Sequence, residues 1–75
     1  MQPARRLTAI IERGDDGFVA LCPELDIASE GGSMEEARNS LIEALTLFFE
    51  TASPSEIAQR SHNDVFVTQI EVQVG

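Results

Sequence analysis

Cys22 and His62 are the only cysteine and the only histidine of this chain, and both residue types could do chemistry. A cysteine nucleophile needs a base or a positive charge to form its thiolate. Cys22 instead ends the apolar run FVALC, where cysteine usually behaves as a small buried hydrophobe, and His62 lies between polar neighbours in a loop. One Cys and one His cannot supply the three or four protein ligands of a zinc site. We expect neither residue to be catalytic.

Carboxylates are plentiful, but their placement does not indicate a metal-dependent enzyme. A two-metal nuclease needs several carboxylates that converge, and only Glu12 and Glu71 fall inside expected outer strands. Gly31 and Gly32 precede an expected helix and could cradle an anion there. However, the pair lacks further glycines and a nearby lysine, and acidic residues surround it. We therefore expect no enzyme activity, no metal and no cofactor.

The charge of the chain is concentrated near its start. The formal net charge is −8, and eight of the 13 acids lie within residues 12–36. Such a surface repels phosphate and attracts basic partners, or it simply keeps the protein soluble. The chain has no Lys, Trp or Tyr, so we expect no direct binding of nucleic acid. The acids expected in turns and in a short strand are the candidate partner-binding residues: Asp15, Asp16, Glu24, Asp26 and Glu30.

The elements that must position these acids follow from local patterns. Residues 5–13 alternate and predict a strand whose core face carries Leu7, Ala9 and Ile11. The sequence GDDG at 14–17 predicts a tight turn, FVALC at 18–22 a central strand that Pro23 ends, and 26–30 a short third strand.

Helical signals come next along the chain. Ser33 and Glu36 form a capping box, and an apolar stripe at three- and four-residue steps predicts a helix of about five turns. The stripe consists of Met34, Ala37, Leu41, Ala44, Leu45, Phe48 and Ala52. Residues 53–56 (SPSE) predict a second, short helical turn, and residues 65–74 predict a long closing strand.

This order, β-β-β-α-β, predicts one α+β domain over residues 1–75. A right-handed crossover would place the last strand beside the first, in sheet order 3-2-1-4, with the main helix on one face. The other face would expose the apolar residues Ile10, Val19, Leu21, Val65 and Val67. A core this small usually needs reinforcement, so we expect a homo-oligomer, a dimer or larger. No export signal and no apolar stretch of membrane-spanning length is present, which favours a cytoplasmic protein without membrane contact.

The run from Asp16 to Leu45 closely resembles the HicB-like antitoxin family of toxin–antitoxin systems. The family pattern has a G-aromatic-x-A strand, P-E-L, a short strand, G-[DG]-[ST]-x-E-E-A and a helix with E-A-[LI]. The matching positions are Gly17, Phe18, Ala20, Pro23, Glu24, Leu25, Gly31, Ser33, Glu35, Glu36, Ala37, Glu43 and Ala44.

This resemblance implies a partly degraded RNase H-like fold and a binding function. The implied partner is a HicA-type toxin, a small basic protein that cleaves RNA, whose RNA-binding and catalytic surface the antitoxin covers. Many family members add a C-terminal DNA-binding module, which this sequence does not show. The alternative is an orphan HicB-like domain, self-associating and structural or regulatory, without a toxin partner. A residual RNase H-like nuclease is a third and weaker hypothesis.

Overall fold

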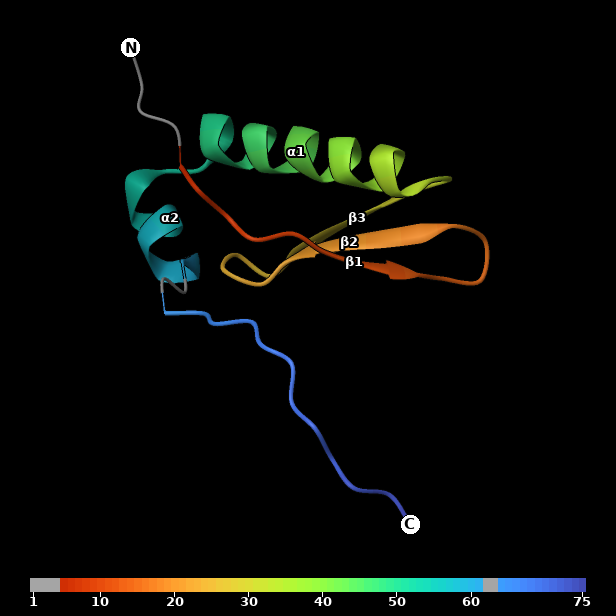
Figure 1. The fold of residues 1–75 in the computed structure, drawn as a ribbon. Coiled ribbons are helices and arrows are strands. Elements are labelled where there is room, and N and C mark those ends of the chain that lie inside the picture. Colours follow the sequence, from red (N-terminus) through yellow and green to blue (C-terminus); the bar gives the residue numbers. More distant parts are fainter. Residues whose placement is uncertain (1–4, 62–63) are drawn as a thin grey trace.

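The computed structural model describes residues 5–61 and 64–75. Three strands, β1 (Ile10–Arg13), β2 (Phe18–Cys22) and β3 (Ile27–Gly31), form an antiparallel sheet in the order β1-β2-β3. The helix α1 (Met34–Thr51) crosses one face of this sheet, and the short helix α2 (Pro54–Arg60) stands at one end (Figure 1). The α+β class is therefore confirmed.

The core lies between α1 and the sheet. The fully buried residues are Ala20, Cys22, Leu25, Ala37 and Leu41. Alternation along β2 explains why Ala20 and Cys22 face the helix while Val19 and Leu21 face the opposite side. The expected helical stripe is largely confirmed, but Met34, in the first turn of α1, is 57% exposed.

Both predicted helix starts are confirmed. The Ser33 Oγ accepts a hydrogen bond from the Glu36 amide at 3.1 Å, and the Ser53 Oγ accepts one from the Glu56 amide at 3.1 Å. The Glu36 carboxylate accepts a hydrogen bond from the Gly32 amide, at 2.8 Å, and not from the Ser33 amide as a capping box predicts. These local contacts satisfy amides that a helix leaves without intrahelical partners.

The first strand is shorter than predicted, since it begins at Ile10 and not at Arg5. Ile10 pairs with Leu21, and beyond Cys22 the proline at position 23 cannot donate to the ladder. The backbone amide of Thr8 instead donates to the Glu24 carboxylate, with both N···O distances 3.1 Å. A side chain therefore replaces the strand partner that this stretch lacks.

The expected fourth strand is not present, and the sheet order 3-2-1-4 is not observed. Residues 64–75 have no regular secondary structure and extend away from the sheet (Figure 1). The reason is the absence of a strand partner, because the alternating apolar pattern of this segment specifies a face but not what covers it. Its large apolar side chains are exposed: Phe66, Val67, Ile70, Val72 and Val74.

The chain passes from β3 into α1 through a close backbone approach at Gly31. A Cβ at this position would collide with the backbone nitrogen of Ala37 and lie 2.6 Å from the carbonyl carbon of Glu36. A Cβ at Gly32 would meet only the flexible carboxylate end of Glu36, at 2.9 Å. Gly31 therefore allows α1 to begin directly against the end of β3.

We predict that Gly31→Ala destabilises the domain by about 1–3 kcal/mol, because backbone atoms cannot yield to the added methyl group. Gly32→Ala is the matched control, and it should change the free energy of unfolding much less. Urea denaturation of both variants measures the difference. Equal midpoints for the two variants would show that the junction does not depend on this approach.

Candidate partner-binding site

Cys22 and Gly32, two of the residues considered above for chemistry, have structural roles. Cys22 is buried, its thiol lies 3.4 Å from Oε1 of Glu24, and burial raises the pKa of this thiol. The Gly32 amide already donates to the Glu36 carboxylate, so an anion at this helix start would have to compete with it. His62 lies outside the described residues. Within residues 5–61 and 64–75, no three His, Cys, Asp or Glu side chains are grouped to hold a metal ion.

The five acidic candidates do not form one surface. Asp15, Asp16 and Glu30 line a single depression of about 480 Å³ at the end of the sheet where the β1–β2 turn lies. Glu24 and Asp26 belong to the β2–β3 connection, at the opposite end of the sheet. The structure thus brings three candidates together and separates two from them.

The pairing register adds Glu12 to the group at the turn. Glu12 lies opposite Val19, and Val19 lies opposite Glu30, so the two glutamates share the face turned away from α1. We call Glu12, Asp15, Asp16 and Glu30 the acidic hairpin surface. Glu12 could have been found from the sequence by pairing the strands across the GDDG turn, which fixes the register.

Arg13, the cationic residue next to Glu12, does not lie on the face that carries the acidic hairpin surface. Arg13 pairs with Phe18 across β1 and β2, and its guanidinium carbon lies 5.1 Å from the centre of the Phe18 ring. Such stacking draws the arginine toward the helix side of the sheet. The acidic hairpin surface therefore presents four exposed carboxylates beside an apolar strand residue, Val19.

Glu24, one of the five candidate partner-binding acids, is a structural carboxylate. It accepts from the Thr8 amide and from the Thr8 Oγ1, the latter at 2.6 Å. Burial opposes its ionisation, but hydrogen bonds from Thr8, from its own backbone amide and from Cys22 outweigh burial and hold the pKa of Glu24 below its usual value. Asp26 is exposed and adopts a left-handed conformation with φ 56° in the connection.

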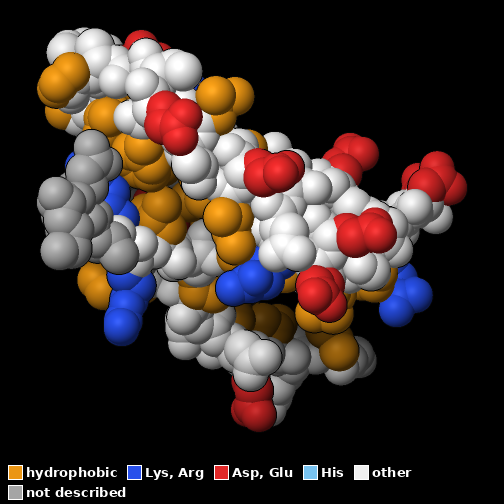
Figure 2. Space-filling view, turned by 90° about the horizontal axis from the view of Figure 1, so that it is seen from above, with side chains coloured by type: hydrophobic (Ala, Val, Ile, Leu, Met, Phe, Trp, Pro, Cys, Tyr) orange, Lys and Arg blue, Asp and Glu red, His pale blue; other side chains and the backbone are white. Residues whose placement is uncertain are grey.

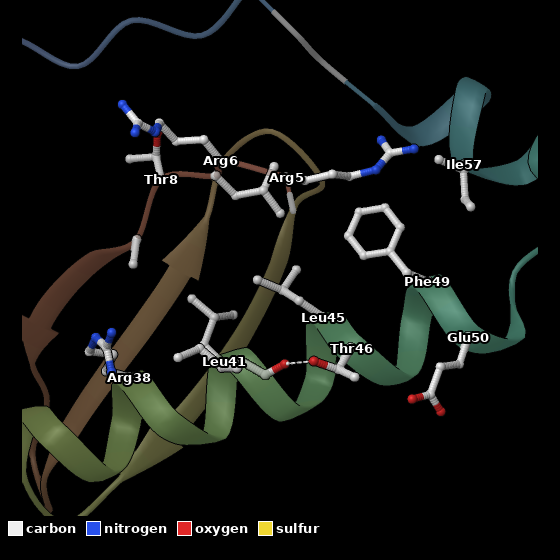
Figure 3. A pocket seen from close by; sticks show the side chains of 13 residues that line it. Arg5, Arg6, Thr8, Arg38, Leu41, Leu45, Thr46, Phe49, Glu50 and Ile57 are labelled. Carbon is white, nitrogen blue, oxygen red and sulfur yellow. Dashed lines mark hydrogen bonds between the residues drawn. The ribbon is translucent and has the colours of Figure 1, made fainter. Parts of the chain in front are cut away.

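A second surface feature is a groove beside the extended stretch that leads into β1. It has a volume of about 1220 Å³ and runs between residues 5–9 and one side of α1 (Figure 3). The residues lining it are Arg5, Arg6, Leu7, Thr8, Ala9, Arg38, Leu41, Ile42, Leu45, Thr46, Phe49, Glu50 and Ile57. We call it the β1-edge groove. None of its lining residues belongs to a strand; they come from residues 5–9, which lead into β1, from α1 and, at Ile57, from α2.

Apolar side chains and arginines occur together along this groove. The guanidinium carbon of Arg5 lies 4.8 Å from the centre of the Phe49 ring, and Arg6 and Arg38 supply two further positive charges. In the view onto α1, acidic side chains follow the exposed helix while apolar and arginine side chains gather in the hollow beside it (Figure 2). The groove is therefore an apolar channel with a cationic lining, distinct from the acidic hairpin surface.

We predict that Glu24→Gln lowers the free energy of unfolding by about 1–2 kcal/mol near neutral pH, because hydrogen bonds to a charged acceptor are the stronger ones. The folded pKa of Glu24 is depressed, so its ionised form stabilises the fold above the unfolded pKa, near 4.5. The stabilisation is lost as the pH falls through the folded pKa.

Denaturant unfolding of wild type and Glu24→Gln from pH 3 to pH 7 tests this. The stability gap should narrow on the acid side. Glu30→Gln, which removes an exposed carboxylate, is the control and should change stability by less than about 0.5 kcal/mol. A gap that stays constant with pH would contradict the role assigned to Glu24.

No helix in the described part of the chain is both long enough and apolar enough to cross a membrane.

The comparison with known proteins gives one relative of this chain. A UPF0150 protein of Helicobacter pylori (strain J99) is 31% identical over 67 residues, which cover 88% of this chain and 93% of that protein. No family model and no solved structure matches the chain. Because the similarity extends over nearly the whole length of both proteins, this chain belongs to the UPF0150 family.

Proposed function

We propose that this protein is an antitoxin-like binding module that neutralises a small basic, RNA-cleaving toxin of the HicA type. It would do so by covering the toxin's RNA-binding and catalytic surface. The observation that carries the proposal is the acidic hairpin surface, where Glu12, Asp15, Asp16 and Glu30 are gathered at one end of the sheet. The resemblance of residues 16–45 to HicB-like antitoxins, and the kinship to a UPF0150 protein, support it.

The physical basis is mimicry of the substrate's charge. A protein that cleaves RNA must bind phosphates with cationic side chains, and clustered carboxylates can occupy the same groups. Complementary charges also steer the two proteins together before they touch. Asp15 and Asp16 lie in the exposed turn, and Glu30 lines the same depression as they do. These three charges can therefore contact one partner together.

Self-association without a toxin is the second candidate function. The observation that favours it is the exposed apolar segment of residues 65–74, which no other part of the described chain covers. An orphan domain of this kind would not inhibit RNA cleavage. The two candidates therefore differ in one assay.

We predict that the purified protein inhibits RNA cleavage by a small basic toxin of the HicA type. The double variant Asp15→Lys with Glu30→Lys should slow association about tenfold or more at low salt, and the difference should shrink as added salt screens the charges beyond about 10 Å. Stopped-flow association across a salt series measures this.

A matched double variant, Glu43→Lys with Glu56→Lys, changes the net charge equally at two exposed positions away from the hairpin. It should slow association much less. Equal slowing of association by both variants would show that the net charge, and not the position of the charges, determines the rate. Absence of inhibition by the wild-type protein would refute the antitoxin function and favour the orphan domain.

A further inference from the structure

The sheet has an open edge at β1. Strand β1 pairs with β2 on one side only, and α1 packs mainly on β3 and β2. The Thr8 amide is directed toward Glu24, on the β2 side. Because backbone groups of an extended chain alternate in direction, the amides of Ala9 and Ile11 are directed to the other, open side. This edge is ready to accept another strand.

The side chains next to this edge also lack a cover. Within the β1-edge groove, Ile42 is 46% exposed, while Leu45 and Phe49 are partly buried against the core. Figure 3 shows Leu41, Leu45 and Phe49 directed from α1 toward the stretch that carries Arg5 and Thr8. A strand added beside β1 would bury this side of the helix.

Residues 65–74 have the properties of the missing strand. Phe66, Ile70, Val72 and Val74 alternate on one face of the extended segment and are 70–89% exposed. Ten extended residues span about 33 Å, comparable to the reach of residues 5–13. The charges of the segment and of the groove are complementary. Residues 64–75 contain Asp64 and Glu71 and no basic residue, whereas three arginines line the groove.

The segment does not turn toward its own groove. Arg60 ends α2, donates from Nη2 to the Leu25 carbonyl at 3.1 Å, and stacks on Phe48 with 5.3 Å between its guanidinium carbon and the ring centre. These contacts hold the end of α2 against the β2–β3 connection. Residues 64–75 extend away from the sheet (Figure 1), and none of them lines the β1-edge groove.

We propose that residues 65–74 of one copy bind in the β1-edge groove of a second copy, as a fourth strand, and that the exchange is reciprocal. Phe66, Ile70, Val72 and Val74 face α1 of the partner copy. The polar alternate positions, such as Gln69 and Gln73, face solvent. Exchange of an identical element between two copies completes both sheets at once and enlarges a core that is small for independent stability.

Disulfide trapping distinguishes exchange between copies from closure within one copy. Ala9→Cys lies on the groove side of the β1 edge, and Thr68→Cys and Ile70→Cys lie on the apolar face of the segment in two possible registers. An Ala9→Cys copy with a size-increasing tag is refolded together with an untagged Thr68→Cys or Ile70→Cys copy and oxidised. We expect a covalent species of mixed size. Glu35→Cys, on the exposed face of α1, replaces Ala9→Cys in the control and should not cross-link.

Two outcomes would overturn the proposal. In the first, a double variant (Ala9→Cys with Thr68→Cys or with Ile70→Cys) forms its disulfide only within a single chain, and the co-refolded samples give no mixed-size species. This result would place the strand in the groove of its own copy. Absence of any cross-link in either register, with light scattering giving a mass near 8.2 kDa, would show that the segment pairs with nothing.

Charge substitution provides a second measurement. Ile70→Asp with Val72→Asp should convert the dimer to a monomer at micromolar concentration, while circular dichroism shows that α1 remains. Gln69→Asp with Gln73→Asp adds the same charge on the other face of the segment and should leave the dimer intact. Dissociation of both variants, or of neither, would contradict the assigned face.

Discussion

The position of α1 is fixed by the backbone contact at Gly31, and most other features of the molecule follow from it. Because no Cβ intervenes, the helix begins directly at the end of β3, with Ala37 seated against that strand. From this start α1 crosses β3 and β2 and covers the core formed by Ala20 and Cys22. The same placement leaves β1 and the adjacent side of the helix uncovered, which creates the β1-edge groove.

Polar contacts complete the fold where the sheet cannot. Glu24 binds Thr8 at the point where Pro23 ends the ladder, and Arg60 binds the Leu25 carbonyl of the same connection. Both contacts lie at the end opposite the acidic hairpin surface. The molecule therefore separates its surfaces by charge. The acidic hairpin surface lies on the face turned away from α1, the arginine-lined β1-edge groove lies beside α1, and the two share no residue.

Local signals predicted much of this fold from the sequence. The capping residues Ser33 and Ser53, the strand FVALC and the apolar stripe around Ala37 and Leu41 depend on neighbours within a few residues, and the structure confirms them. Non-local contacts could not be predicted in this way. Thr8 and Glu24 are 16 residues apart, so nothing near either residue indicates that the carboxylate is a substitute for a strand partner.

Residues 65–74 are a second case in which a local pattern could not predict a non-local contact. Alternation predicted a strand over these residues, which the structure does not contain, because the pattern cannot specify the edge on which a strand pairs or whether that edge belongs to the same copy. The acidic candidates were similarly ambiguous. Composition grouped Glu24 and Asp26 with Asp15, whereas strand register groups Glu12 and Glu30 with it.

In the proposed dimer, residues 65–74 of one copy complete the open edge of β1 in the other. Amide hydrogen exchange at several protein concentrations tests this pairing, because only pairing between copies depends on concentration. We expect residues 65–74 and the stretch from Leu7 to Ile11 to gain protection together as the concentration rises. Protection of both that is independent of concentration, or no protection of residues 65–74 at any concentration, would contradict it.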